Sequence, residues 1–166
     1  MTDRPGGPLL FLDVDGPLLP FGGSRPCGPG EVDGPPRLMR LRVDAGPRLA
    51  ALPCTLVWAT SWLEDANTEI APRLGLPRLP VVAWPELTAA SEREDQWFGL
   101  CRKTRTLVSW AAGRPFAWVD DEVADADRDW VTARHPGRAL LLRIDASRGL
   151  ADQDFAALDA WLRSLP

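Results

Sequence analysis

The chain has 166 residues, the size of one ordinary domain, and 45% of them are apolar, which is enough for a buried core. Its formal net charge of -4 argues against a general nucleic-acid-binding protein, and no apolar stretch reaches the length of a membrane span. The first residues lack a signal-peptide pattern, and the three cysteines have no metal-ligand spacing. We therefore expect one cytoplasmic domain over residues 1–166, with reduced thiols and no membrane partner. The sequence does not indicate an oligomeric state.

Residues 8–13 are predicted to form the first strand, because a short apolar run ends abruptly in acidic residues. Gly16 and Pro17 then turn the chain. Asp13 and Asp15 are two residues apart, so their side chains leave the strand end on the same side, where like charges repel. A bound cation or a shared proton would compensate that repulsion, which favours a metal-assisted site. A solvated turn and a calcium loop, which also uses a DxDG pattern, are the alternatives.

A stretch rich in glycine and proline follows, and we expect a flap or loose hairpin over residues 17–43, with residues 37–43 as its return strand. Asp44 is a candidate cap for a short helix that runs to Leu52. Further strands are predicted over 55–59, 79–84, 115–119 and 139–144, and further helices over 62–70, 91–112 and 150–165. Strands that alternate with helices indicate an α/β fold with a mostly parallel sheet of about five strands.

Ligands of parallel α/β sheets bind beyond the carboxyl ends of the strands. Three predicted strands deliver polar or acidic side chains to that edge, namely Asp13 and Asp15, Thr60 and Ser61, and Asp120 and Asp121. Lys103 is the single lysine of an arginine-rich chain, which suggests that a compact point charge is needed at that position. His135 is the single histidine and is expected in a surface turn, which argues against Ser-His chemistry.

Four segments in this order resemble the motifs of the haloacid dehalogenase (HAD) superfamily of hydrolases. They are Phe11-Leu12-Asp13-Val14-Asp15-Gly16, Val57-Trp58-Ala59-Thr60-Ser61, Lys103 and Trp118-Val119-Asp120-Asp121, and the resemblance covers residues 9–145. More narrowly, Ala59-Thr60-Ser61-Trp62 together with Ala66-Asn67 is similar to the HAD family named after Swiss Army Knife RNA repair proteins. The resemblance implies a three-layer, Rossmann-like fold with helices on both faces of the sheet and a minimal cap.

The resemblance also implies a Mg²⁺-dependent phosphatase. Asp13 would be the nucleophile that forms an aspartyl-phosphate, and Asp15 would protonate the leaving oxygen and then activate water. Thr60 and Ser61 would bind a phosphoryl oxygen, and Lys103 would neutralise the developing charge. The protein ligands of Mg²⁺ would be oxygens of Asp13, Asp15 (through its backbone carbonyl), Asp120 and Asp121.

Each assignment has an alternative: Thr60 and Ser61 cap the next helix, and Asp120 and Asp121 form a solvated acidic turn. A HAD fold that keeps the metal site as a non-catalytic binding module is the rival function, although an intact Asp15 favours an enzyme. A receiver domain is disfavoured, because the second strand ends in threonine. Pro17 departs from the usual motif, since it lacks a backbone donor and stiffens the flap.

The phosphorylated substrate stays open among nucleotides, sugar phosphates, phosphoproteins and the terminal phosphate of a nucleic acid. Five arginines in or next to the flap are candidate phosphate contacts, with a purely solvated role as the alternative: Arg25, Arg37, Arg40, Arg42 and Arg48.

Overall fold

In the computed structural model, which describes residues 6–22 and 36–166, four strands form one parallel sheet. They are β1 (Leu9–Leu12), β2 (Thr55–Trp58), β3 (Phe116–Asp120) and β4 (Ala139–Arg143). The order across the sheet is β2-β1-β3-β4, and every neighbouring pair is parallel. The predicted α/β fold is confirmed, with four strands where about five were expected.

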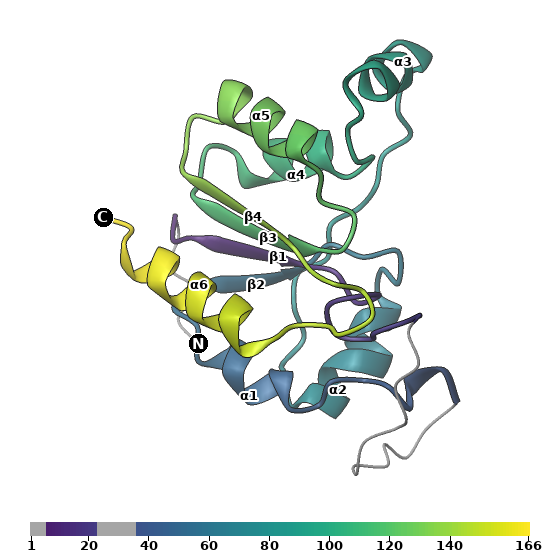
Figure 1. Cartoon of the computed structure of the whole chain (residues 1–166), viewed down its shortest axis with the longest axis vertical. Helices are drawn as coiled ribbons and strands as arrows, with labels where there is room; N and C mark the ends of the chain where they lie inside the picture. Colours follow the sequence, from purple (N-terminus) through teal and green to yellow (C-terminus); the bar gives the residue numbers. More distant parts are fainter. Residues whose placement is uncertain (1–5, 23–35) are drawn as a thin grey trace.

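Helices cover both faces of the sheet, as Figure 1 shows. On one face, Leu10 and Leu12 of β1 share a core with three helices, α1 (Ala45–Ala50), α2 (Ala71–Leu74) and α6 (Asp152–Arg163). On the other face, Leu9 and Phe11 share a core with α4 (Thr104–Ala111) and α5 (Asp125–Arg134). Because alternate residues of a strand point to opposite faces, β1 is apolar throughout and lies at the centre of a three-layer fold.

The expected strand over residues 79–84 does not form. This segment makes an isolated bridge between Val81 and Trp58 of β2, with hydrogen bonds from Trp58 N to Pro80 O (2.8 Å) and from Val82 N to Trp58 O (2.9 Å). The ladder would continue through an N–H group at position 80, which proline lacks. The segment therefore lies extended along the edge of β2 without becoming a fifth strand.

The single helix expected over residues 91–112 is two helices, α3 (Ala89–Phe98) and α4. Gly99 ends α3 in the left-handed conformation (φ 69°) that glycine adopts easily. The break places Lys103 at the N-cap of α4, and Figure 1 shows α3 projecting beyond α4, away from the sheet. The sequence predicts no element over α5, because Trp130 and Val131 are its main apolar residues.

Three smaller expectations also need correction. The return segment of the flap is not a strand, because Pro36–Leu38 form a 3-10 helix and residues 39–44 continue as turns and irregular backbone. Residues 23–35 of the flap lie outside the described residues. The helix expected over 62–70 is a turn followed by a π-helical stretch, Ala66–Ile70, that continues into α2. Asp44 precedes α1 but pairs with Arg42 instead of capping the helix.

His135 is buried rather than at the surface. Its ring packs edge-on against Phe116, with centroids 4.8 Å apart, and its Nε2 lies 3.0 Å from the Arg114 carbonyl oxygen. Phe116 begins β3, so the histidine lies at the end of the sheet opposite Asp120. Across the described residues, every helix falls short of the length and apolar character that crossing a membrane requires.

Candidate active site

The sheet order places the ends of β2, β1 and β3 side by side at one edge. Asp13 follows β1 directly, and its backbone N–H donates to the Val119 carbonyl oxygen (3.1 Å). Leu12 pairs with Val119, so the register sets Asp13 beside Asp120, the last residue of β3. Thr60 follows β2 by two residues on the other side of β1. The parallel ladder therefore positions the first carboxylate before any side-chain contact is considered.

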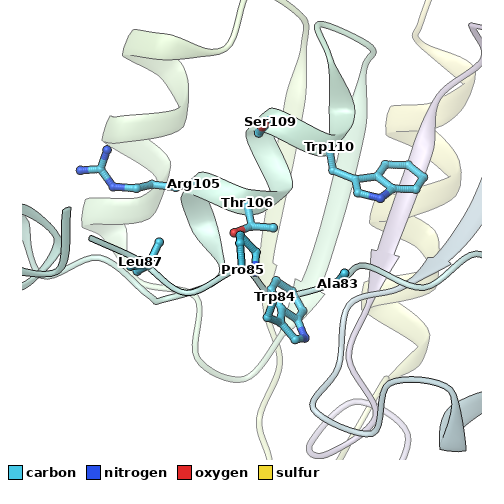
Figure 2. Close-up of a pocket in the computed structure, with 8 residues that line it drawn as sticks. All are labelled: Ala83, Trp84, Pro85, Leu87, Arg105, Thr106, Ser109 and Trp110. Atoms are coloured by element: carbon cyan, nitrogen blue, oxygen red, sulfur yellow. The ribbon is translucent and has the colours of Figure 1, made fainter. Parts of the chain in front are cut away.

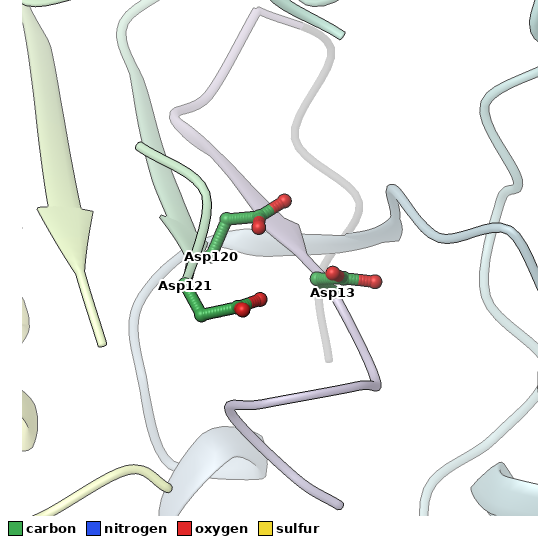
Figure 3. Close-up of side chains that lie close together, drawn as sticks. All are labelled: Asp13, Asp120 and Asp121. Atoms are coloured by element: carbon green, nitrogen blue, oxygen red, sulfur yellow. The ribbon is translucent and has the colours of Figure 1, made fainter. Parts of the chain in front are cut away.

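Three carboxylates converge at this edge, as Figure 3 shows. Asp13, Asp120 and Asp121 each offer an oxygen atom, and these atoms all lie within 4.8 Å of one another. Asp13 is 6% exposed and Asp120 is fully buried. Like charges repel strongly in such a dry environment, so the cluster needs cations. Because all the donors are oxygens at this spacing, the residues present fit a hard divalent ion such as Mg²⁺.

Lys103 supplies one cation from within the chain. Its Nζ lies 3.0 Å from Asp13 Oδ2 and 2.7 Å from Asp120 Oδ2, and its side chain is 4% exposed. An ammonium group has three donors, so the lysine bridges both carboxylates and keeps one N–H for a further acceptor. The single lysine of the chain is thus a buried bridge between the predicted nucleophile and a predicted metal ligand.

Burial of the site changes the protonation of its members. Burial and the Asp120 charge raise the pKa of Asp13 to about 7, although Lys103 and the Val14 N–H, which donates to Asp13 Oδ1 (2.8 Å), both lower it. Burial and the Asp120 charge also raise the pKa of Asp121. Burial alone would lower the pKa of Lys103, but the two carboxylates outweigh it and raise that pKa. One lysine therefore leaves an excess of negative charge, which a divalent cation would balance.

Different neighbours orient the two aspartates at the end of β3. The Trp118 indole N–H donates to Asp120 Oδ2 (3.2 Å), and the Glu122 N–H donates to Asp120 Oδ1 (3.0 Å). Asp121 lies against Gly16, where an added Cβ atom would be 2.8 Å from Asp121 Oδ1. Gly16 also has φ of 98°, in the region that favours glycine. This glycine therefore serves both the turn after β1 and the space that Asp121 occupies.

Asp15 turns its side chain toward a different neighbour. The Trp62 indole N–H donates to Asp15 Oδ2 (3.0 Å), and the Arg37 guanidinium lies over the same indole ring, 5.1 Å from its centroid. Asp15 is partly exposed, whereas Asp13 is buried. Two residues of the same short segment thus face a closed and an open environment.

Thr60 is fully buried, and its Oγ1 accepts the Trp62 N–H (3.2 Å) within the turn after β2. It does not cap the next helix, because that helical stretch begins at Ala66 with Asp65 as its N-cap residue. The hydroxyl hydrogen is not used by the bond from Trp62, so it can still donate to a phosphoryl oxygen. The Trp84 indole donates to the Thr60 carbonyl oxygen (3.1 Å), and its ring centroid lies 6.0 Å from Lys103 Nζ. Ser61 is exposed.

Asp127 belongs to the support of the site, and sequence reasoning missed it. It is fully buried, and its Oδ1 accepts both the Cys101 N–H (2.9 Å) and the Thr104 hydroxyl (2.6 Å), while its Oδ2 accepts the Ala124 N–H (2.9 Å). One carboxylate thereby ties the turn that carries Lys103 to the start of α5. An aspartate in the first turn of a helix is a recognisable capping signal, but its contact with a distant turn has no local signature.

Two hollows of similar size lie nearby. The first, about 530 Å³, is lined by Asp15, Leu19, Pro20, Phe21, Arg37 and Arg40. The second, about 520 Å³, lies between residues 83–87 and α4 (Figure 2) and is lined by Ala83, Trp84, Pro85, Leu87, Arg105, Thr106, Ser109 and Trp110. The second is mostly apolar, and its one charged side chain, Arg105, is paired with Glu94 and Asp95 of α3. The first combines a predicted catalytic carboxylate with cationic groups.

A parallel α/β sheet whose first and third strands end in aspartates, with a lysine between them, is the arrangement of HAD-type proteins. Residues 9–155 match the family described as the HAD domain in Swiss Army Knife RNA repair proteins, and the chain belongs to this family. The predicted family is therefore confirmed, and membership of a HAD family indicates a hydrolase. Comparisons with curated proteins and with solved structures found no match.

Proposed function

We propose that this chain is a Mg²⁺-dependent phosphohydrolase in which Asp13 forms an aspartyl-phosphate. The observation that carries the proposal is the contact of Lys103 with both Asp13 (3.0 Å) and Asp120 (2.7 Å), within a cluster of three convergent carboxylates. A nucleophile, a buried cation and a set of oxygen ligands thus meet at the carboxyl end of the sheet. That combination suits transfer of a dianionic phosphoryl group, which needs positive charge close to a carboxylate.

In the proposed reaction, a bond forms between a carboxylate oxygen of Asp13 and phosphorus, and the bond from phosphorus to the leaving oxygen breaks. Asp15 gives its proton to that oxygen, then takes a proton from the water that hydrolyses the aspartyl-phosphate. Because Trp62 donates to Asp15 Oδ2, the other oxygen, Oδ1, is the one left to exchange the proton in the proposed reaction. Lys103 holds Asp13 in place and neutralises charge on the phosphoryl group.

Mg²⁺ would be held by Asp13, Asp120 and Asp121, together with the backbone carbonyl of Asp15. When bound, the ion supplies neutralisation and orientation of the phosphoryl oxygens. The Thr60 hydroxyl and backbone N–H groups near Ser61 bind another phosphoryl oxygen. Asp120 is held by three donors of the chain, so Asp121, which is less buried, offers the ion its more accessible carboxylate.

The substrate class that we favour is a nucleotide or the terminal phosphate of a nucleic acid. Two observations support it: the family description names RNA repair, and the chain has no insertion long enough for a separate cap domain, which leaves room for a bulky substrate. A reducing, cytoplasmic setting is part of the same proposal. It agrees with the free thiols of Cys54 and Cys101, for both of which burial raises the pKa to about 12.

Hydrolysis of p-nitrophenyl phosphate by the wild type, Asp13→Asn and Asp15→Asn proteins, each with Mg²⁺ and with chelator, tests the proposal. We expect turnover only in the wild type with Mg²⁺, unchanged circular dichroism in both variants, and a phosphorylated Asp13 peptide after acid quenching of the wild type reaction. Activity that survives in Asp13→Asn, or in chelator, would contradict the mechanism. Mg²⁺ binding without turnover on mononucleotides or phosphorylated oligonucleotides would favour the non-catalytic binding module instead.

A further inference from the structure

We propose that the hollow beside Asp15 binds a second phosphate, the phosphodiester next to the terminal phosphate of a nucleic-acid strand. This inference rests on the proposed function, because the hollow gains its meaning from a phosphoryl group attached to Asp13. The starting observation is its location. Asp15 lines the hollow and is the residue that would protonate the leaving oxygen, so the leaving group must extend into this space.

Two arginines give the hollow an affinity for anions. Arg37 belongs to the 3-10 helix Pro36–Leu38 and Arg40 follows three residues later, and both line the hollow with exposed side chains. Leu38, between them, is fully buried and fixes the segment to the core. Planar guanidinium groups bind the oxygens of phosphate through two parallel hydrogen bonds, which a lysine cannot reproduce. The hollow therefore presents two phosphate-binding groups beside one carboxylate.

Arg37 is held in place by the catalytic machinery itself. Its guanidinium lies over the Trp62 ring, and the same indole donates to Asp15. A cation over an aromatic ring is stabilised while its N–H groups stay available at the ring edge. Arg40 donates to the Gly22 carbonyl oxygen (3.4 Å), which links it to the segment on the other side of the hollow. Both guanidinium groups thus stand beside the carboxylate that is proposed to protonate the leaving oxygen.

Two other arginines that the sequence grouped with Arg37 and Arg40 do not line the hollow. Arg42 forms an ion pair with Asp44 (2.8 Å) and donates to the Arg148 carbonyl oxygen (3.0 Å). Arg48 forms an ion pair with Asp152 (2.6 Å) and lies over the Phe155 ring, on the side of α6. Both are committed to structural contacts, and Arg25 lies outside the described residues.

The remaining walls suit the sugar and base that connect two phosphates. Leu19, Pro20 and Phe21 are apolar, and Phe21 is 50% exposed, which is unusual for a phenylalanine in a folded domain. A volume of about 530 Å³ lies within the range of small-molecule sites. An apolar wall opposite two arginines matches a nucleoside with an anionic linkage better than it matches a sugar phosphate, whose leaving group is neutral and polar.

The test compares two phosphorylated dinucleotides that share the same terminal phosphate but differ in the linkage, which is a natural phosphodiester in one and an uncharged methylphosphonate in the other. Both 5′- and 3′-phosphorylated pairs are used. We expect the natural linkage to give about tenfold higher kcat/KM in the wild type, the effect of one hydrogen bond between charged groups. Arg37→Gln and Arg40→Gln should each bring that ratio toward one, whereas the control Arg48→Gln should keep it.

A wild type ratio near one, or a ratio that survives both substitutions, would overturn the inference while leaving hydrolysis of p-nitrophenyl phosphate intact. A nucleoside 3′,5′-bisphosphate that is hydrolysed faster than every dinucleotide would overturn the assignment to a phosphodiester. If the wild type hydrolyses nothing, the proposed function fails, and calorimetric titration with the same dinucleotides decides the hollow separately. The inference is supported if the wild type binds the charged linkage more tightly and Arg37→Gln abolishes that preference. Equal binding of both linkages by the wild type rejects the inference.

Discussion

The candidate site has a closed side and an open side, and the segment from Asp13 to Asp15 connects them. On the closed side, Asp13 and Asp120 are buried around Lys103. On the open side, Asp15 meets Trp62 beneath Arg37, next to a hollow of about 530 Å³. Strand register and burial set the geometry of the closed side, so substitutions there should lower stability as well as activity. The open side is held by single contacts, so changes there should affect the reaction alone.

The largest difference between the two sides should come from Lys103→Met. The substitution keeps an unbranched side chain that is one atom shorter, and it leaves two buried carboxylates without their cation. We expect it to lower the free energy of unfolding by about 3 kcal/mol and turnover by about a thousandfold. Arg163→Met is the control, because it breaks only an exposed ion pair with Asp159 and should leave stability nearly unchanged. Urea unfolding and steady-state kinetics measure both effects. Equal losses of stability and turnover in the two variants would contradict a special role for the buried ion pairs of Lys103.

The closed side should also make stability depend on pH. With the pKa of Asp13 raised to about 7, the folded chain keeps a proton that the unfolded chain releases near its ordinary value of 3.8. The folded state therefore binds more protons between these values, so stability falls as pH rises through this window, by on the order of 2 kcal/mol between pH 5 and 7.

Thermal unfolding in chelator, at several pH values, measures this slope, and Asp13→Asn should flatten it. Added Mg²⁺ binds the deprotonated carboxylates, so the stabilisation that it brings should grow as pH rises toward 7. A slope that is the same in Asp13→Asn as in the wild type would assign the pH dependence to other groups.

Gly16→Ala tests the boundary between the two sides. Its new Cβ would meet Asp121 Oδ1 at 2.8 Å, so we expect Mg²⁺ affinity to fall by roughly tenfold to a hundredfold. Gly75→Ala is matched, because Gly75 also has a positive φ (68°) but open space around the added atom. Each variant should lose about 1–2 kcal/mol through backbone strain. If calorimetry shows equal Mg²⁺ affinity in both variants, the contact with Asp121 is without consequence.

Helices α5 and α6 provide a matched pair for Asp127. Asp154 accepts the Ala151 N–H at the start of α6 (2.8 Å), just as Asp127 accepts the Ala124 N–H, but only Asp127 also holds the turn of Lys103. Replacement of Asp154 by asparagine should cost about 1 kcal/mol of stability. Asp127→Asn should cost more, because Asp127 is fully buried and accepts two further hydrogen bonds. Only Asp127→Asn should also lower kcat, by about tenfold, with little change in KM. A similar kcat in both variants would reduce Asp127 to a helix cap.

The smallest effect is expected on the open side, from Trp62→Phe. The ring stays, but the N–H donor to Asp15 is lost, which we expect to lower kcat about fivefold at unchanged stability. The loss should be greater for alkyl phosphates than for p-nitrophenyl phosphate, because a poor leaving group depends more on the acid. Trp161→Phe, in α6, is the control and should leave kcat unchanged for both kinds of substrate. A uniform loss on all substrates would argue against a role in protonation.

The sequence predicted the central strands of the fold and the convergence of Asp13 and Asp120 at one edge, because both depend on short apolar runs that end in polar residues. Asp13 and Asp120 follow from strand position, and Lys103 from being the single lysine. Two of the predictions of secondary structure that were wrong have physical causes. Pro80 lacks the donor that the expected fifth strand needs, and Gly99 divides what seemed one helix.

Contacts between distant segments escaped the sequence analysis. The buried role of Asp127 could not be predicted, because its neighbours along the chain are also acidic and no local pattern distinguishes the carboxylate that is fully buried. The hydrogen bond from Trp62 to Asp15 could not be predicted, because it depends on how the turn after β2 packs. Residues 125–134 form a helix, but the sequence signal for it is weak because few of these residues are apolar. Trp130 and Val131 are the apolar residues of this helix that reach the core.

The uniqueness of Lys103 has a practical use in spectroscopy. A protein grown with isotope-labelled lysine would carry one labelled side chain, and that side chain is 4% exposed between two aspartates. Slow exchange of its ammonium protons with water would make a single, well-separated nuclear resonance. That resonance would follow ion binding, phosphorylation of Asp13 and product release in real time, free of overlap from the rest of the chain.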